Sequence, residues 1–236
     1  MKRVKDIRKE LVEKYLNNDI VIDKTGSKIV EVLGQSFFAD EEAIIGKVSK
    51  AYVKKELEWY RSTSLNVWDM PNPPKIWQQI SDKDGYINSN YGWVIYHEDN
   101  GYQYKNVLRT LRKHRDSRRA VMIYNRPSMQ EEYNKNGMSD FMCTNAVNYF
   151  LREDPLVGLQ SWAVVQMRSN DAVFGYKNDL YWQNHVLTEL TNDLQDDYPV
   201  TVGGILWNAA SLHVYERHFD LLQEKSMVKD VEMAGI

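Results

Sequence analysis

The residue with the clearest chemical potential is the single cysteine of the chain. Cys143 is the only cysteine among 236 residues and lies in the stretch Ser139 to Asn145. A lone thiol cannot form an internal disulfide, so it serves either as a small buried hydrophobe or as a nucleophile. Composition alone favours the first role. A downstream cluster of residues suited to phosphate and base recognition, from Arg168 to Asp179, favours the second.

Other charged residues also allow a simple structural interpretation. Glu56 falls within a helical pattern, where glutamates usually face solvent. Arg118 and Arg119 precede a strand, where they could protect a sheet edge or bind an anion, and the sequence alone favours the edge. Asp179 could merely cap a helix near Leu180.

Composition places the chain among ordinary globular proteins. Hydrophobic residues make up 43% and charged residues 27%, and the net charge of −3 argues against general nucleic-acid binding. The charged N-terminus has no following apolar run, so we expect no signal peptide. No run of 18 apolar residues occurs, which predicts no membrane association. With a single cysteine, the expected location is the cytoplasm.

Motifs for several common chemistries are missing from the sequence. Neither the phosphate loop of nucleotide triphosphatases nor a glycine-rich dinucleotide turn occurs. One cysteine and five scattered histidines exclude a thiolate zinc site. His213 and His218 are five residues apart and would lie on different faces of a helix. We therefore expect no bound metal.

Hydrophobic periodicity predicts the elements that position these residues. Helices are expected at 4–15, 51–61, 102–112 and 175–194, with a last helical region beginning at 213–215. Strands are expected at 29–34, 120–124, 143–151, 159–167 and 202–207. The aromatic residues at 76–77 and 90–93 are expected on loops that wall a ligand site. The irregular order predicts a single α+β domain over 1–236, with helices against one mixed or mainly antiparallel sheet.

Several short motifs resemble one enzyme family. Arg168-Ser169-x-Asp171, followed by Gly175 and Asp179, resembles the Arg-Ser-x-Asp…Gly…Asn signature of the thymidylate synthase family. Four further motifs resemble that family and occur in its order: the phosphate turn at Asp23-Lys24-Thr25-Gly26, the catalytic-glutamate helix at Glu56-Leu57-x-Trp59, the arginine pair at Asp116-Ser117-Arg118-Arg119 and the sugar-binding motif at His213-x-Tyr215-x-x-His218. Together they span roughly residues 20 to 220.

Departures from the family pattern point to one branch of it. Cys143 lies between Met142 and Thr144 where the family has Pro and His, Lys24 replaces an arginine, and Asp179 replaces an asparagine. Longer stretches resemble the bacteriophage branch that hydroxymethylates deoxycytidylate. The resemblance implies the thymidylate synthase fold, a homodimer, deoxycytidylate (dCMP) as substrate and 5,10-methylenetetrahydrofolate as one-carbon donor.

The resemblance also implies a role for each motif residue. Cys143 would add to carbon 6 of the base with its pKa lowered by Arg168, Glu56 would order the proton-shuttling water, and Tyr91 would lie near the reaction centre. The other implied contacts are phosphate binding by Lys24, Arg168, Ser169 and, from the partner subunit, Arg118 and Arg119; sugar binding by His213 and Tyr215; and folate binding by Trp77 and Asp171.

Asp179 is the residue expected to select the base. An ionised carboxylate has only acceptors, so it would suit the exocyclic amine of cytosine and favour a protonated nitrogen 3. Two alternatives stay open: an enzyme that methylates or hydroxymethylates deoxyuridylate, and a nucleotide- or RNA-binding homologue without catalysis. The presence of Cys143 and Glu56 argues against the second. Association with other nucleotide-synthesis enzymes is a further expectation.

Overall fold

The protein is built on one mixed β-sheet. The computed structural model describes the backbone of residues 1–233 and the side chains of residues 1–226. Within these residues the sheet has eight strands in the order β1-β3-β8-β6-β5-β4, with β2 beside β3 and β7 beside β8. The strands are β1 (Lys2–Arg3), β2 (Val21–Ile22), β3 (Lys28–Phe38), β4 (Val121–Ile123), β5 (Thr144–Asp154), β6 (Gly158–Met167), β7 (Asn170–Asp171) and β8 (Thr201–Tyr215).

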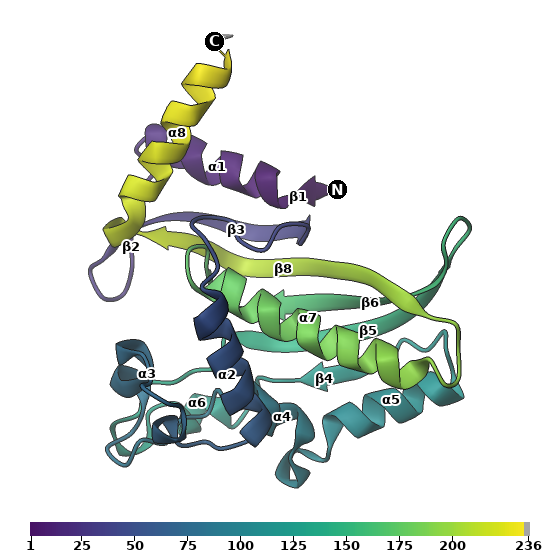
Figure 1. Ribbon diagram of the computed structural model, residues 1–236. Helices are drawn as coiled ribbons and strands as arrows, with labels where there is room; N and C mark the ends of the chain where they lie inside the picture. The colour runs from purple at the N-terminus through teal and green to yellow at the C-terminus, as the bar shows by residue number, and fades with distance from the viewer. Residues whose placement is uncertain (234–236) are drawn as a thin grey trace.

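Helices cover one face of this sheet and one of its edges. In Figure 1, α7 runs along the sheet with α2 and α5 on the same side, whereas α1 and α8 lie together beyond β3. The helices are α1 (Val4–Leu16), α2 (Lys50–Ser62), α3 (Lys75–Ile80), α4 (Tyr91–Tyr96), α5 (Gln103–Lys113), α6 (Met129–Glu132), α7 (Gly175–Leu194) and α8 (Phe219–Met233), with short 3₁₀ turns at Val67–Asp69, Glu98–Asn100, Lys135–Gly137 and Glu216–His218. No described helix is long and apolar enough to cross a membrane. The α+β prediction with a mixed sheet is confirmed.

The prediction of a helical region beginning at residue 213 is wrong. β8 continues to Tyr215, and the last helix, α8, begins only at Phe219. Antiparallel pairing with β3 extends β8, with Val30 opposite Val214 and Ile29 opposite Tyr215. The argument about helical faces for His213 and His218 therefore fails, because His213 lies on a strand.

The aromatic residues expected on loops lie on short helices instead. Trp77 belongs to α3 and Tyr91 begins α4. Asn90 caps α4 by accepting from Trp93 N at 2.8 Å, and its amide donates to the carbonyl oxygen of Trp59 at the end of α2. A Cβ at Gly92 would lie 1.7 Å from the carbonyl oxygen of Tyr60, so only glycine lets α4 approach α2 this closely. This contact fixes Tyr91 beside the helix that carries Glu56.

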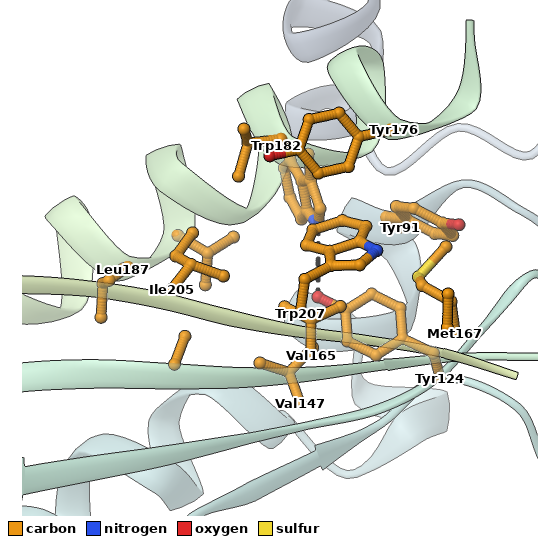
Figure 2. Close-up of a cluster of buried hydrophobic side chains, with 14 of the residues drawn as sticks. Tyr91, Tyr124, Val147, Val165, Met167, Tyr176, Trp182, Leu187, Ile205 and Trp207 are labelled. Atoms are coloured by element: carbon orange, nitrogen blue, oxygen red, sulfur yellow. Dashed lines mark hydrogen bonds between the residues drawn. The ribbon is translucent and has the colours of Figure 1, made fainter. Parts of the chain in front are cut away.

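The main core lies between α7 and the covered sheet face. Figure 2 shows Trp182, Trp207 and Tyr124 in one buried cluster, in which Trp182 Nε1 donates to Tyr124 Oη at 3.1 Å and the ring of Trp207 lies edge-on to that of Tyr176 at 5.2 Å. Trp182 and Trp207 are at most 1% exposed. Such dense packing of large rings holds α7 in one position on the sheet, and with it the residues of its first turns.

No helix within residues 1–233 covers the opposite sheet face. Side chains alternate between the two faces of a strand, so Trp162 and Val164 point away from the buried Ala163 and Val165. With Phe38, Phe150 and Leu206 they line a broad hollow of about 810 Å³. An apolar face of this kind is typical of an interface with another chain.

Candidate active site

A cavity at one end of the sheet gathers most of the residues expected to do chemistry. Its volume is about 260 Å³, and it lies between α2, α3, α7 and the segment before β5. The sequence-predicted residues that line it are Glu56, Trp77, Tyr91, Cys143, Asp171 and Asp179. Each of the six lies on a different helix, strand or loop, so the fold brings them together.

Cys143 immediately precedes β5, where the strand is irregular. The β5–β6 register shifts between Thr144 and Ala146, which is the pattern of a β-bulge. The Sγ atom lies 3.7 Å from a guanidinium nitrogen of Arg168. Burial raises the pKa of the thiol to about 11, and Arg168 opposes this only in part. Arg168 lowers the pKa as expected, but desolvation outweighs it, so the expectation of a thiol pKa below its ordinary value is wrong.

Arg168 is held by the backbone next to the cysteine. Its guanidinium donates to the carbonyl oxygens of Met142 at 2.8 Å and Phe141 at 2.6 Å, and lies over the Phe141 ring. Its own backbone N–H donates to the carbonyl oxygen of Cys143 at 2.9 Å. Arg168 thus fixes the segment that carries the thiol and places a positive charge beside it.

Glu56 is buried on α2 and held by two donors. The hydroxyl of Tyr52 and the indole N–H of Trp77 both donate to Oε1, the indole at 3.2 Å. The side chain is 5% exposed, and burial raises its pKa to about 7 although both hydrogen bonds oppose that rise. A carboxyl group with a pKa near neutrality is suited to both accepting and donating a proton.

Trp77 has a different contact from the one the resemblance implies. Its indole N–H is engaged with Glu56 and, at 3.1 Å, with Tyr52 Oη. Its ring lies edge-on to Trp59 at 5.3 Å. The described contacts make Trp77 a support for Glu56, and stacking on folate stays a prediction.

Asp179 projects from the second turn of α7 and does not cap the helix. The N-cap position is Phe174, and Asp179 Oδ2 instead accepts from Asn170 Nδ2 at 2.9 Å. Burial, together with the negative charge of Glu56, raises the pKa of Asp179 to about 8. The neutral form of the carboxyl therefore predominates at pH 7. This corrects the expectation of an ionised group, and the capping alternative is wrong.

Tyr91 connects these groups to the start of β5. It is 4% exposed, stacks on Tyr60 at 5.3 Å and accepts from Thr144 Oγ1 at 3.0 Å. Its hydroxyl also lies close enough to Asp179 to lower the pKa of that carboxyl. Tyr91 therefore lies between the cysteine segment and the carboxyl expected to read the base.

The remaining predicted residues do not line this cavity. Lys24 is exposed in the turn between β2 and β3, and Arg118 and Arg119 are exposed before β4. Ser169 is half-buried next to Arg168. His213 is 6% exposed on β8, with Nδ1 3.3 Å from Ser211 Oγ and its ring edge-on to that of Tyr215. The structure does not by itself assign a ligand to any of these.

Three buried contacts at the site were missed from the sequence. Tyr52 lies four residues before Glu56, a helical spacing that could have indicated the contact. Asp140 is 4% exposed and accepts from the backbone N–H groups of Asn88 and Ser89, which anchors the cysteine segment. Asn170 occupies the position that the Arg-Ser-x-Asp motif leaves open. No local pattern marks the last two.

A second cavity adjoins the first. It has a volume of about 580 Å³ and shares Tyr52, Ile76, Asp171, Phe174 and Asn178 with the smaller one. Three cationic side chains, Lys47, Lys177 and Arg217, also line it. Within the described part of the chain, no group of three or more His, Cys, Asp or Glu residues is arranged to hold a metal ion.

Comparison with known proteins identifies the family. The family model for thymidylate synthase matches residues 10–233, so the chain belongs to the thymidylate synthase family. Two similar proteins are named deoxycytidylate 5-hydroxymethyltransferase: that of Enterobacteria phage T6 is 52% identical over 93% of this chain and 89% of its own length, and that of phage T4 is 51% identical over the same shares. Among solved structures, a thermostable thymidylate synthase A from Bacillus subtilis has the same fold, with a TM-score of 0.67 at 22% identity over 94% of this chain and 83% of that one.

Proposed function

We propose that this chain is a deoxycytidylate 5-hydroxymethyltransferase, which transfers a one-carbon unit to carbon 5 of dCMP with addition of water. Relatives more than 50% identical carry this name. The observation that carries the proposal is the buried carboxyl of Asp179, with its raised pKa, in a cavity shared with Cys143 and Glu56. A carboxyl at this position, where the family pattern has an amide, can pair with both nitrogen 3 and the exocyclic amine of cytosine.

The pairing with cytosine follows from the donors and acceptors of a neutral carboxyl. One oxygen carries a proton that can be donated to nitrogen 3, and the other accepts from the exocyclic amine. As the proton moves toward nitrogen 3, the ring becomes more electrophilic at carbon 6. Asp179 would therefore assist the attack of Cys143 while it selects the base.

Cys143 would be the nucleophile. Its thiolate adds to carbon 6, and the electron pair of the 5,6 double bond makes carbon 5 nucleophilic. The 5,10-methylenetetrahydrofolate would supply the electrophilic methylene for the new bond at carbon 5. Loss of the carbon 5 proton with elimination of tetrahydrofolate would leave an exocyclic methylene. Water would add to this methylene, and re-formation of the 5,6 double bond would expel Cys143 as the thiolate. Because burial raises the thiol pKa to about 11, substrate binding would have to favour ionisation, to which Arg168 contributes.

Glu56 would position and deprotonate the added water. Both of its described hydrogen bonds reach Oε1, which leaves Oε2 for a water molecule. Its pKa of about 7 allows it to take a proton from that water near neutral pH.

The adjoining cavity fits the folate. Ile76 and Phe174 offer apolar surface for a flat ring, and Asp171, which lines both cavities, could bind ring nitrogens. Lys47, Lys177 and Arg217 suit an anionic tail. The donor and acceptor set of this cavity therefore matches the co-substrate that the family resemblance implies.

We further propose a homodimer that forms through the uncovered sheet face. The apolar hollow there and the exposure of Arg118 and Arg119 support this arrangement, in which the two arginines would bind phosphate in the partner's site. Mixing Arg118→Ala subunits with Cys143→Ala subunits should restore part of the activity, because one hybrid site regains both groups. A monomer in light scattering, or no rescue on mixing, would contradict the shared site.

A turnover assay tests the main proposal. Purified protein is incubated with 5,10-methylenetetrahydrofolate and dCMP, deoxyuridylate or CMP, and the products are identified by mass spectrometry. We expect the hydroxymethyl product from dCMP. A methyl product, or turnover restricted to deoxyuridylate, would overturn the proposal.

A further inference from the structure

A buried amide holds the carboxyl of Asp179. Asn170 Nδ2 donates to Asp179 Oδ2 at 2.9 Å, and the Asn170 side chain is 2% exposed. Its strand, β7, pairs in parallel with β8, with Asn170 opposite Leu212. Asn170 Oδ1 is buried and finds no hydrogen-bond partner among the described residues. Because an unpaired buried carbonyl oxygen destabilises a fold, stability alone does not account for an amide here.

The start of α7 leaves room for this contact. A Cβ at Gly175 would lie 3.1 Å from Asn170 Nδ2 and 3.7 Å from Asp179 Oδ2. The first of these distances is tighter than an ordinary contact, so any larger residue would push the amide away. The absence of a side chain at Gly175 therefore leaves the space in which the Asn170 amide contacts the Asp179 carboxyl.

A neutral carboxyl group can pair with either pyrimidine base, cytosine or uracil. With its proton on one oxygen it donates to nitrogen 3 and accepts from the amine of cytosine. With its proton on the other oxygen it accepts from nitrogen 3 and donates to oxygen 4 of uracil. Protonation of Asp179 therefore permits cytosine without excluding uracil, and something else must decide which oxygen carries the proton.

We propose that Asn170 is the positioning residue that makes this choice and so directs the site toward cytosine. Its N–H group donates to Oδ2, so Oδ2 stays an acceptor and the proton of Asp179 resides on Oδ1. The second lone pair of Oδ2 then accepts from the exocyclic amine while Oδ1 donates to nitrogen 3. This inference rests on the proposed function, because it concerns how the same site selects dCMP.

The other groups that affect Asp179 are distinct from Asn170. Glu56 and Tyr91 act on it from α2 and α4, and Asp171 acts from β7. A change at Asn170 alone leaves all three in place. Because its hydrogen bond lowers the pKa of Asp179, removing the amide should raise that pKa further.

Asn170→Leu tests the inference, because leucine has a similar size and no donor. Thr191→Val, which removes a buried hydrogen bond from the far end of α7, is the matched control. Carbon-13 NMR of labelled aspartate carboxyls follows the titration of substrate-free protein, and Asp179→Asn identifies the Asp179 resonance. We expect a higher titration midpoint in Asn170→Leu and an unchanged one in Thr191→Val.

The base preference supplies the second measurement. The ratio of kcat/KM for dCMP to that for deoxyuridylate should fall at least about tenfold in Asn170→Leu and stay constant in Thr191→Val. An unchanged midpoint together with an unchanged ratio in a folded, active variant would overturn the role of Asn170. If the leucine variant does not fold, Asn170→Ser gives the same comparison, because its side chain is too short to reach Oδ2. Absence of dCMP turnover in the wild type would instead contradict the proposed function, and the NMR titration would still report whether Asn170 holds the carboxyl.

Discussion

Two buried polar residues of α7, one toward each end of the helix, have contrasting surroundings. Toward its C-terminal end, Thr191 is 1% exposed, lies 2.6 Å from Ser161 Oγ and donates to the carbonyl oxygen of Leu187. Toward its N-terminal end, Asp179 lines a cavity with a second carboxyl, and its partner Asn170 keeps an oxygen unpaired. The polar groups around Thr191 satisfy one another, whereas those around Asp179 leave an acceptor unpaired beside a cavity, which is the difference between a structural contact and a site prepared for a ligand.

The largest effect is expected when the nucleophile in the cavity beside Asp179 is removed. Cys143→Ser should lower turnover of dCMP by roughly 10⁴-fold or more, because a hydroxyl at its ordinary pKa is not ionised by Arg168. Nucleotide binding, measured by calorimetry, should stay close to that of the wild type. Near-normal exchange of the carbon 5 proton in this variant would show that no covalent step through Cys143 takes place.

Replacing the base-reading acid should change the substrate. Asp179→Asn should lose activity on dCMP and gain activity on deoxyuridylate, because an amide donates to oxygen 4 and accepts from nitrogen 3. Mismatched buried polar groups can change the preference between two substrates on the order of 10⁴-fold. The change of preferred nucleotide should therefore be measurable even in a slow variant. Competition between the two nucleotides, read by product mass, measures it. An unchanged preference would remove the basis for assigning cytosine.

The same carboxyl should make stability depend on pH. The folded-state pKa of Asp179 is about 8 against an ordinary value of 3.8, so its neutral form is favoured by folding. The contribution of this carboxyl to the free energy of unfolding is fully present below about pH 4 and is lost as the pH rises toward 8. At about 1.4 kcal/mol for each of about four pKa units, we expect thermal unfolding at different pH values to show a stability loss of at most about 6 kcal/mol across this range, and Asp179→Asn should reduce that loss. If the stability of the wild type and of Asp179→Asn changed with pH in the same way, the raised pKa would be contradicted.

The smallest effect is expected at Thr191, whose hydroxyl is hydrogen-bonded toward the C-terminal end of the helix. Thr191→Val should lower the free energy of unfolding by about 1 kcal/mol, because Ser161 loses its partner across the interface with β6. Chemical denaturation measures the loss, and kcat/KM for dCMP should not change. A clear drop in activity would show that the two halves of α7 are not independent.

Much of the secondary structure is determined locally. The predicted limits of α7, residues 175–194, agree with the structure, and β5 and β6 differ from their predicted ranges by only a few residues. Apolar spacing of 3.6 or 2 residues reports which face a segment buries, and that spacing is a property of the segment itself. The residues of the candidate site, Cys143, Glu56 and Asp179, were likewise found from short motifs.

Only the tertiary structure decided the length of β8 and the protonation of the site. His213 lies on a strand because nine positions of β3 pair with β8, a contact between segments far apart in sequence. Burial raises the pKa of Cys143, Glu56 and Asp179, although the sequence suggested a lowered thiol pKa and an ionised Asp179. The identity and spacing of side chains are written in the local sequence. Desolvation of a group instead depends on every segment that packs around it, and that packing exists only once the sheet and its helices have assembled.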